Sequence, residues 1–304
     1  MATISATETV RVRDDGLIQV AATPSRSEAR RVLAQLVRKP MVVVGALVIL
    51  GWVTVSILAP VLTSFDPVEV NVDDRLDPPS AEHWLGVDGL GRDVLTRVLY
   101  GGRVSLPVAA VVVVVASIFG TLYGALAGYL GGWFDEVAMR VVDMVLAFPS
   151  LILAMAIAAA LGSSIHNSML AMLVVWWPPY TRLARGQVLA LKARDFVSAA
   201  EALGVSERRI LLRHVLPNAV APSIVLMAMD FGNAIIITAA LSFLGLGAVP
   251  PTPEWGAMVA EGRELTAQWW ISTFPGVAIL MVALAANFVG DGLRDAIDPR
   301  LRVR

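Results

Sequence analysis

The residues best suited to bind another molecule lie in a polar segment, residues 195–217, between two long apolar segments. Its cationic side chains are those of Arg208, Arg209, Arg213 and His214. Guanidinium groups bind anions, and we expect contact with lipid head groups or a protein groove here more than phosphate binding. No second ligand lies near His214, so we expect it to form a hydrogen bond that fixes the loop before Pro217 rather than to bind a metal ion.

The hydrophobic spacing of this segment predicts two short helices joined by a glycine. Residues at i, i+3, i+4 and i+7 form one apolar face of the first helix: Phe196, Ala199, Ala200 and Leu203. Gly204 then ends that helix, because glycine adopts a left-handed turn at little cost. Ser206 can cap a second helix that has Glu207 in its first turn. A helix–glycine–helix unit on the aqueous side of a membrane protein is a candidate docking surface for another protein.

The composition is that of a membrane protein. Of the 304 residues, 57% are hydrophobic and only 16% are charged, against about 25% in soluble domains. The net charge of −1 implies no polyelectrolyte partner such as nucleic acid. Cysteine is absent and the histidines are far apart, which argues against disulfides and metal sites. Neither lysine, Lys39 or Lys192, is followed by Ser or Thr, so the phosphate-binding sequence GxxxxGK[ST] does not occur.

Six apolar segments predict an all-α membrane protein with six transmembrane helices. They are residues 41–62, 104–128, 138–161, 168–190, 218–247 and 272–292. Pro178 and Pro179 should kink the fourth. If the N-terminus lies in the cytoplasm, the cytoplasmic segments hold 19 of the 24 Lys and Arg residues. Because cytoplasmic segments are usually rich in Lys and Arg, this distribution favours cytoplasmic termini.

These segments divide the chain into four parts. We expect a disordered cytoplasmic tail (1–40), a first transmembrane helix with an extracytoplasmic loop (41–103), a transmembrane core (104–292) and a short cytoplasmic C-terminal tail (293–304). Three tryptophans near the second outer loop suit either the membrane interface or a partner contact: Trp255, Trp269 and Trp270.

Two polar residues, Asp230 and Asn233, lie inside the fifth predicted span. An ionisable group at such depth costs at least ~2.5–3.5 kcal/mol on insertion scales, so it usually faces a bundle or a cavity. The pair either lines a path for a transported molecule or forms an interhelical hydrogen bond. Thr238, on the same span, is a third candidate for the path.

Smaller patterns predict helix contacts. Gly120, Gly124 and Gly128 form two GxxxG spacings, which favour close packing within this subunit or against a partner. Arg140 and Asp143 are three residues apart, which predicts a local ion pair.

The polar segment resembles the EAA loop of ABC importer permeases. The shared pattern is Ala199-Ala200, three residues, Gly204, nine residues, and His-x-Leu-Pro at 214–217. The position that is usually Glu is Ser198 here. Further segments are similar to the C-type permease of the dipeptide, oligopeptide and nickel importers: residues 83–106, 128–154, 180–196, 241–247 and 290–302. Val87 and Thr238 depart from that family's usual Thr and Glu.

The resemblance implies a MetI-like transmembrane domain in the bacterial plasma (inner) membrane that is not itself an enzyme. Its partners would be a second, B-type permease, two ATPase subunits that carry ATP and Mg²⁺, and an extracytoplasmic solute-binding protein. The loop that couples to the ATPases would include Ser198, Ala199, Ala200, Glu201, Gly204, Arg208, Arg209, His214, Leu216 and Pro217.

Di- or oligopeptides are the leading substrate, with nickel chelates or glutathione as alternatives. A self-contained secondary transporter is a second class of function. Such a protein usually shows an inverted repeat with paired broken helices, and no obvious repeat relates the two halves of this sequence.

Overall fold

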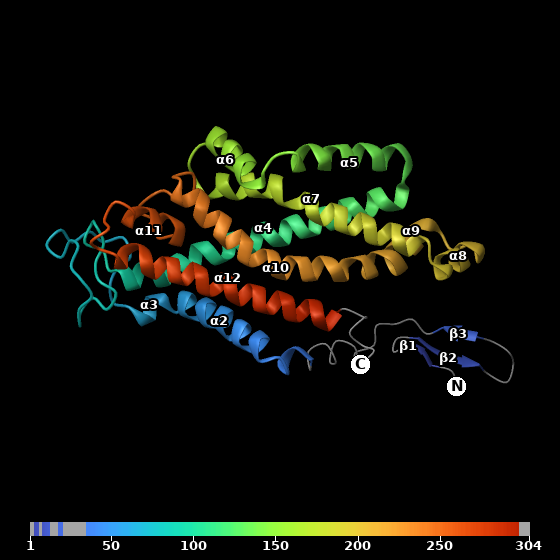
Figure 1. The fold of residues 1–304 in the computed structure, drawn as a ribbon, viewed down its shortest axis with the longest axis horizontal. Helices are drawn as coiled ribbons and strands as arrows, with labels where there is room; N and C mark the ends of the chain where they lie inside the picture. The colour runs from blue at the N-terminus through green and yellow to red at the C-terminus, as the bar shows by residue number, and fades with distance from the viewer. Residues whose placement is uncertain (1–2, 6–7, 13–17, 21–34, 298–304) are drawn as a thin grey trace.

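The computed structural model describes residues 3–5, 8–12, 18–20 and 35–297, and its long helices form one elongated bundle (Figure 1). The first part of the chain contains three short antiparallel strands in the order β1-β2-β3: β1 (Thr3–Ser5), β2 (Glu8–Val12) and β3 (Ile18–Val20). Disorder was predicted for this tail and stays a prediction, and apart from the strands residues 1–34 lie outside the described residues. The last residues, 298–304, lie outside them as well.

Five long helices make the bundle: α2 (Pro40–Ile57), α4 (Val94–Leu130), α7 (Ile165–Lys192), α10 (Leu216–Phe243) and α12 (Trp270–Ile297). α4 packs on α7 and α10, and α12 packs on α10 and α2. α2 begins and α12 ends on the side of the bundle where α8 (Asp195–Ala202) lies (Figure 1), and Lys39 Nζ donates a 2.6 Å hydrogen bond to Asp295 Oδ2 there. We call this the α8 end.

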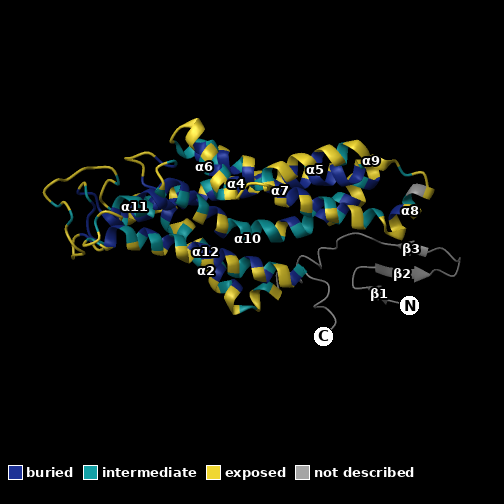
Figure 2. Cartoon of the chain, turned by 45° about the horizontal axis from the view of Figure 1, so that its top comes forward, coloured by how far each residue is buried: buried dark blue, intermediate teal, exposed yellow. Residues whose placement is uncertain are grey.

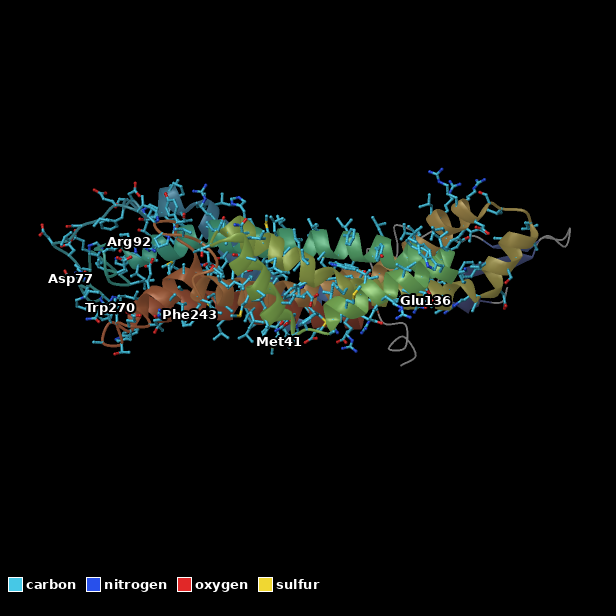
Figure 3. The ribbon with its side chains drawn as sticks, turned by 90° about the horizontal axis from the view of Figure 1, so that it is seen from above. Met41, Asp77, Arg92, Glu136, Phe243 and Trp270 are labelled. Carbon is cyan, nitrogen blue, oxygen red and sulfur yellow. The ribbon has the colours of Figure 1, made fainter. Side chains whose placement is uncertain are left out.

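The opposite end carries α3 (Ala59–Leu62), the loop of residues 63–93 and α11 (Trp255–Gly262), and we call it the α11 end. Arg92 and Trp270 both lie at this end of the molecule (Figure 3). The observed loop ends at residue 93, ten residues earlier than predicted. Asp93 caps α4 there by accepting a 2.7 Å hydrogen bond from the Thr96 backbone N–H. Residues 94–103, predicted as loop, are therefore the first part of α4.

Small residues explain how α4 approaches α7 so closely. A Cβ on Gly128 would lie 3.0 Å from the Arg185 carbonyl oxygen, and Cβ atoms on Gly120 and Gly124 would lie still closer to the backbone of α7. Of the two interpretations of the GxxxG spacing, packing within the subunit is thus the one confirmed.

Four helices are long and apolar enough to cross a membrane in the described residues: α2, α4, α12 and the continuous helix from Glu207 to Phe243. α5 (Gly132–Leu146) and α6 (Ser150–Leu161) together would make a fifth span, but they are bent by 86°. The single helix predicted over 138–161 is therefore two helices in the structure. Pro149 precedes α6 and disfavours the helical conformation of Phe148, which breaks the helix there.

α7 occupies the place of the fourth predicted span, residues 168–190. It has 28 residues, enough to cross a bilayer, but Arg182, Arg185 and Lys192 lower its hydropathy below that of the other candidates. The helix continues through Pro178 and Pro179 without ending; the kink expected from this pair stays a prediction.

A buried polar network holds the α11 end together. Arg92 Nε lies 2.7 Å from Asp88 Oδ2, and Arg92 and Arg97 each donate to Glu261, over 2.9 and 3.0 Å. Both arginine side chains are almost fully buried. The network joins the loop of residues 63–93 to α4 and α11, and sequence spacing gave no sign of it.

Two of the three tryptophans considered for the membrane interface are core residues. Trp255 and Trp270 are buried, and their indole N–H groups donate to the backbone carbonyls of Val98 (2.8 Å) and Val87 (3.0 Å). Both proposed roles, interface belt and partner contact, are wrong for these two, because each indole finds its acceptor inside the subunit. Trp269 is 55% exposed.

Candidate coupling surface and membrane-embedded polar site

The predicted helix–glycine–helix unit is present at the α8 end. α8 ends before Gly204, and α9 (Glu207–Ile210) follows it. Gly204 has φ of +75°, and a Cβ added there would meet no atom within 4 Å. The position therefore requires glycine for its left-handed backbone and not for space. Ser206 occupies the N-cap position of α9, as predicted, although its side chain makes no capping hydrogen bond.

A small second core holds this unit on the bundle. The buried residues Val197 and Ile210 belong to it, together with side chains of α4, α7, η1 (Leu211–Val215) and α10: Ala125, Tyr129, Val188, Val215 and Ala219. The Tyr129 hydroxyl also donates a 2.9 Å hydrogen bond to the Glu207 carbonyl, and Lys192 Nζ donates to the Tyr129 carbonyl over 2.7 Å. A displacement of α8 and α9 would therefore be transmitted to α4 and α7.

The outward side of the unit combines exposed apolar and cationic side chains. Phe196, Leu203 and Leu212 are 41%, 83% and 51% exposed. Ser206, Leu212 and three exposed arginines line a hollow of about 290 Å³: Arg208, Arg209 and Arg213. We call Phe196, Leu203, Leu212 and these arginines the coupling surface; Figure 2 shows how exposed α8 and α9 are. Water-exposed apolar groups gathered in this way indicate a protein partner.

The apolar face predicted for α8 points outward. Phe196, Ala199 and Leu203 are exposed, Ala200 is partly buried, and the residue that anchors α8 is Val197. Ser198 is exposed beside Ala199, and Glu201 lies within α8. The spacing correctly identified one face of this helix. That face is exposed instead of packed on the bundle, so it can contact a partner.

The segment before Pro217 is helix and not loop, which corrects the expectation for His214. A π-helical turn, η1 (Leu211–Val215), joins α9 to α10, and the Leu216 N–H donates to the Leu211 carbonyl. Pro217 lacks an N–H and its ring crowds the carbonyl four residues earlier, so a wider turn relieves the clash. His214 is exposed, and its backbone carbonyl accepts a 2.6 Å hydrogen bond from Asn218 Nδ2.

A polar cluster lies midway along α10. The Tyr180 hydroxyl of α7 donates a 2.8 Å hydrogen bond to Asp230 Oδ2, and the side chains of Trp176 and Asn233 lie near this carboxylate. The predicted interhelical hydrogen bond thus exists. The path interpretation is not excluded by it, because Asp230 is only partly buried and Asn233 is exposed.

Thr238 belongs to a different environment. It is 1% exposed, and its hydroxyl donates to the Ala234 carbonyl over 2.8 Å and contacts Met172 Sδ of α7 at 3.3 Å. The structure therefore separates Thr238 from the surface that carries Asn233.

Ion pairs connect α5 to the α8 end of α7. Arg185 forms two hydrogen bonds to Asp135 (2.5 and 2.7 Å), and Arg182 lies 2.5 Å from Asp143. The predicted Arg140–Asp143 pair was wrong: Arg140 pairs with Glu136 at 3.4 Å. Asp143 instead meets a guanidinium on the neighbouring helix, which spacing along α5 could not reveal. Glu136 lies at the end of the molecule away from Arg92 (Figure 3).

Comparison with known families identifies the chain. Residues 120–303, more than half of it, match the family described as binding-protein-dependent transport system inner membrane component. The chain belongs to this family. Residues 27–79 additionally match the N-terminal transmembrane domain of oligopeptide transport permease C.

Several relatives are similar over most of their length. The dipeptide transport system permease protein DppC of Alkalihalophilus pseudofirmus is 45% identical over 274 residues, 90% of each chain. The probable D,D-dipeptide transport system permease protein DdpC of Escherichia coli is 44% identical, over 91% of this chain and 93% of its own. A glutathione transport system permease protein, GsiD of E. coli, is 43% identical over 87% and 88%.

A solved structure supports the predicted MetI-like fold. An inward-facing structure of the MetNI methionine ABC transporter contains a chain that aligns with 64% of this one and 94% of its own length, with a TM-score of 0.50 and 14% identity. At this identity the likeness concerns the fold alone.

Proposed function

We propose that this chain is one of two permease subunits of an ATP-driven importer of di- or oligopeptides. A second permease, two ATPase subunits and an extracytoplasmic solute-binding protein complete the transporter. The observation that carries the proposal is the coupling surface, which combines exposed apolar and cationic side chains on a unit fixed to α4 and α7. The dipeptide permeases among its relatives support the substrate class.

In this proposal the α8 end lies in the cytoplasm and the α11 end faces outward. ATP and Mg²⁺ bind to the separate ATPase chains, whose closure displaces α8 and α9. The contacts of Tyr129 and Lys192 pass this displacement to α4 and α7. The protein resides in the bacterial inner membrane with both termini on the cytoplasmic side, in agreement with the distribution of Lys and Arg.

Glutathione is a second candidate substrate. It is favoured by the glutathione permease at 43% identity. Glutathione and a dipeptide both carry a free amino group and a carboxylate, so the same path could serve both. Competition between the two for uptake by the assembled transporter would decide which it prefers.

The absence of cysteine allows a clean test of the coupling surface. Leu203→Cys places a single thiol on its most exposed apolar residue. We expect this thiol to cross-link to a co-expressed ATPase subunit, and the cross-link to change with bound nucleotide. Trp133→Cys, 77% exposed on α5, is the matched control and should cross-link weakly. Equal cross-linking at both positions would contradict the assignment of the surface.

A further inference from the structure

The carboxylate of Asp230 is a negative charge surrounded by neutral groups. The Tyr180 hydroxyl donates a hydrogen bond to it, and the side chains of Trp176 and Asn233 lie nearby. None of these groups brings a positive charge. Within the part of the chain that the structure describes, no Lys, Arg or His contributes to its environment.

The position of Asp230 makes this arrangement unusual. It lies roughly 21 Å along α10 from Leu216, which is half of the helix's length of about 42 Å. A helix centred on a hydrocarbon core of about 30 Å therefore places it near the middle of that core. A charged carboxylate at that depth is normally paired with a cation or faces a water-filled cavity. The Tyr180 hydroxyl holds this one in place but brings no positive charge to compensate it.

The surface beside Asp230 carries one exposed polar side chain. Asn233, nearly one helical turn away, is exposed. An amide facing lipid hydrocarbon would lose its hydrogen bonds to water without replacement. This side of α10 therefore faces water or another polar surface, and a cation could reach Asp230 from it.

We propose that Asp230 binds the protonated amino group of the transported molecule, with the side-chain carbonyl of Asn233 as a second acceptor. An ammonium group supplies both the missing positive charge and three hydrogen-bond donors. Tyr180 acts as a positioning residue that fixes the carboxylate toward the path. This inference rests on the proposed function, and it predicts that the transporter prefers substrates with a free amino terminus.

The test compares two substrates in liposomes that contain the complete transporter and saturating binding protein. One is a labelled dipeptide with a free amino group, and the other is its N-acetylated form. For each variant, uptake of each substrate is divided by wild-type uptake of the same substrate, so that discrimination by the binding protein cancels. Asp230→Asn keeps the size of the side chain and removes its charge.

For Asp230→Asn we expect the uptake ratio to fall about tenfold for the free dipeptide and to stay near one for the acetylated form, because only the former brings a charged donor. Tyr180→Phe should give a smaller loss with the same selectivity. Thr238→Val, a buried change on the same helix, should affect both substrates equally.

Equal effects of Asp230→Asn on both substrates would overturn the proposal. Failure of both Asp230→Asn and Tyr180→Phe to form the assembled complex would also overturn it. Asp230 would then have a structural role, either within this subunit or as the partner of a cation on the second permease. If wild-type liposomes take up neither peptide, the proposed function fails first, and that outcome is distinguishable from a failure at Asp230.

Discussion

Replacing Gly204 should uncouple the transporter without preventing its assembly. The φ of +75° costs a residue with a Cβ roughly 1–2 kcal/mol. No atom lies within 4 Å of a Cβ built at this position, so steric contact adds nothing to that cost. Gly204→Ala should therefore shift the equilibrium between docking-competent and distorted turns by about tenfold, and the β-branched Gly204→Val by more.

The assay is ATPase activity of the assembled complex with and without substrate-loaded binding protein. We expect Gly204→Val to insert and to pair with its partner permease but to lose most of the stimulation, and Gly204→Asn to keep most of it because Asn tolerates this conformation. Gly186→Ala is the matched control. A Cβ on Gly186 would also meet no atom within 4 Å, but the φ of Gly186 is not positive. A Gly204→Val complex with normal stimulation and uptake would refute the reasoning.

Three further predictions concern packing, docking and topology. Gly124→Val should destabilise the subunit by roughly 1–3 kcal/mol, because its side chain would collide with the backbone at Thr181; thermal melting against Gly51→Ala, which meets no neighbour, measures this. Ser198→Glu should be tolerated or should strengthen ATPase binding in pull-down assays, since Ser198 is exposed on α8; a lethal effect would mean a different docking mode. Reporter fusions at Ser80 and Ser206 should report opposite sides of the membrane, and two cytoplasmic readings would contradict the topology.

Local patterns predicted the parts of the structure that depend on neighbouring residues. The turn at Gly204 followed from glycine between two short helices, and the positions of the long helices followed from apolar segments. Pro149 was also visible in the sequence, but hydropathy averaged over a window hid the break that it causes.

Contacts between distant segments could not be predicted in this way. The Arg182–Asp143 pair and the Tyr180–Asp230 hydrogen bond join residues on different helices, and one sequence does not say which helices are neighbours. The same limit explains Trp255, whose indole is satisfied by the carbonyl of Val98 in α4. From the sequence alone, an amphipathic tryptophan side chain suits the membrane interface as well as it suits a core position with a hydrogen-bond acceptor.

ATP dependence of uptake tests the central claim most directly. Liposomes containing this chain, its partner permease and the ATPases would receive ATP on the side of α8 and substrate-loaded binding protein on the side of α11. The account predicts accumulation of labelled dipeptide that requires both and that stops when ATP is replaced by ADP. Accumulation by this chain without ATPase subunits, driven by an ion gradient, would contradict it and would identify a secondary transporter.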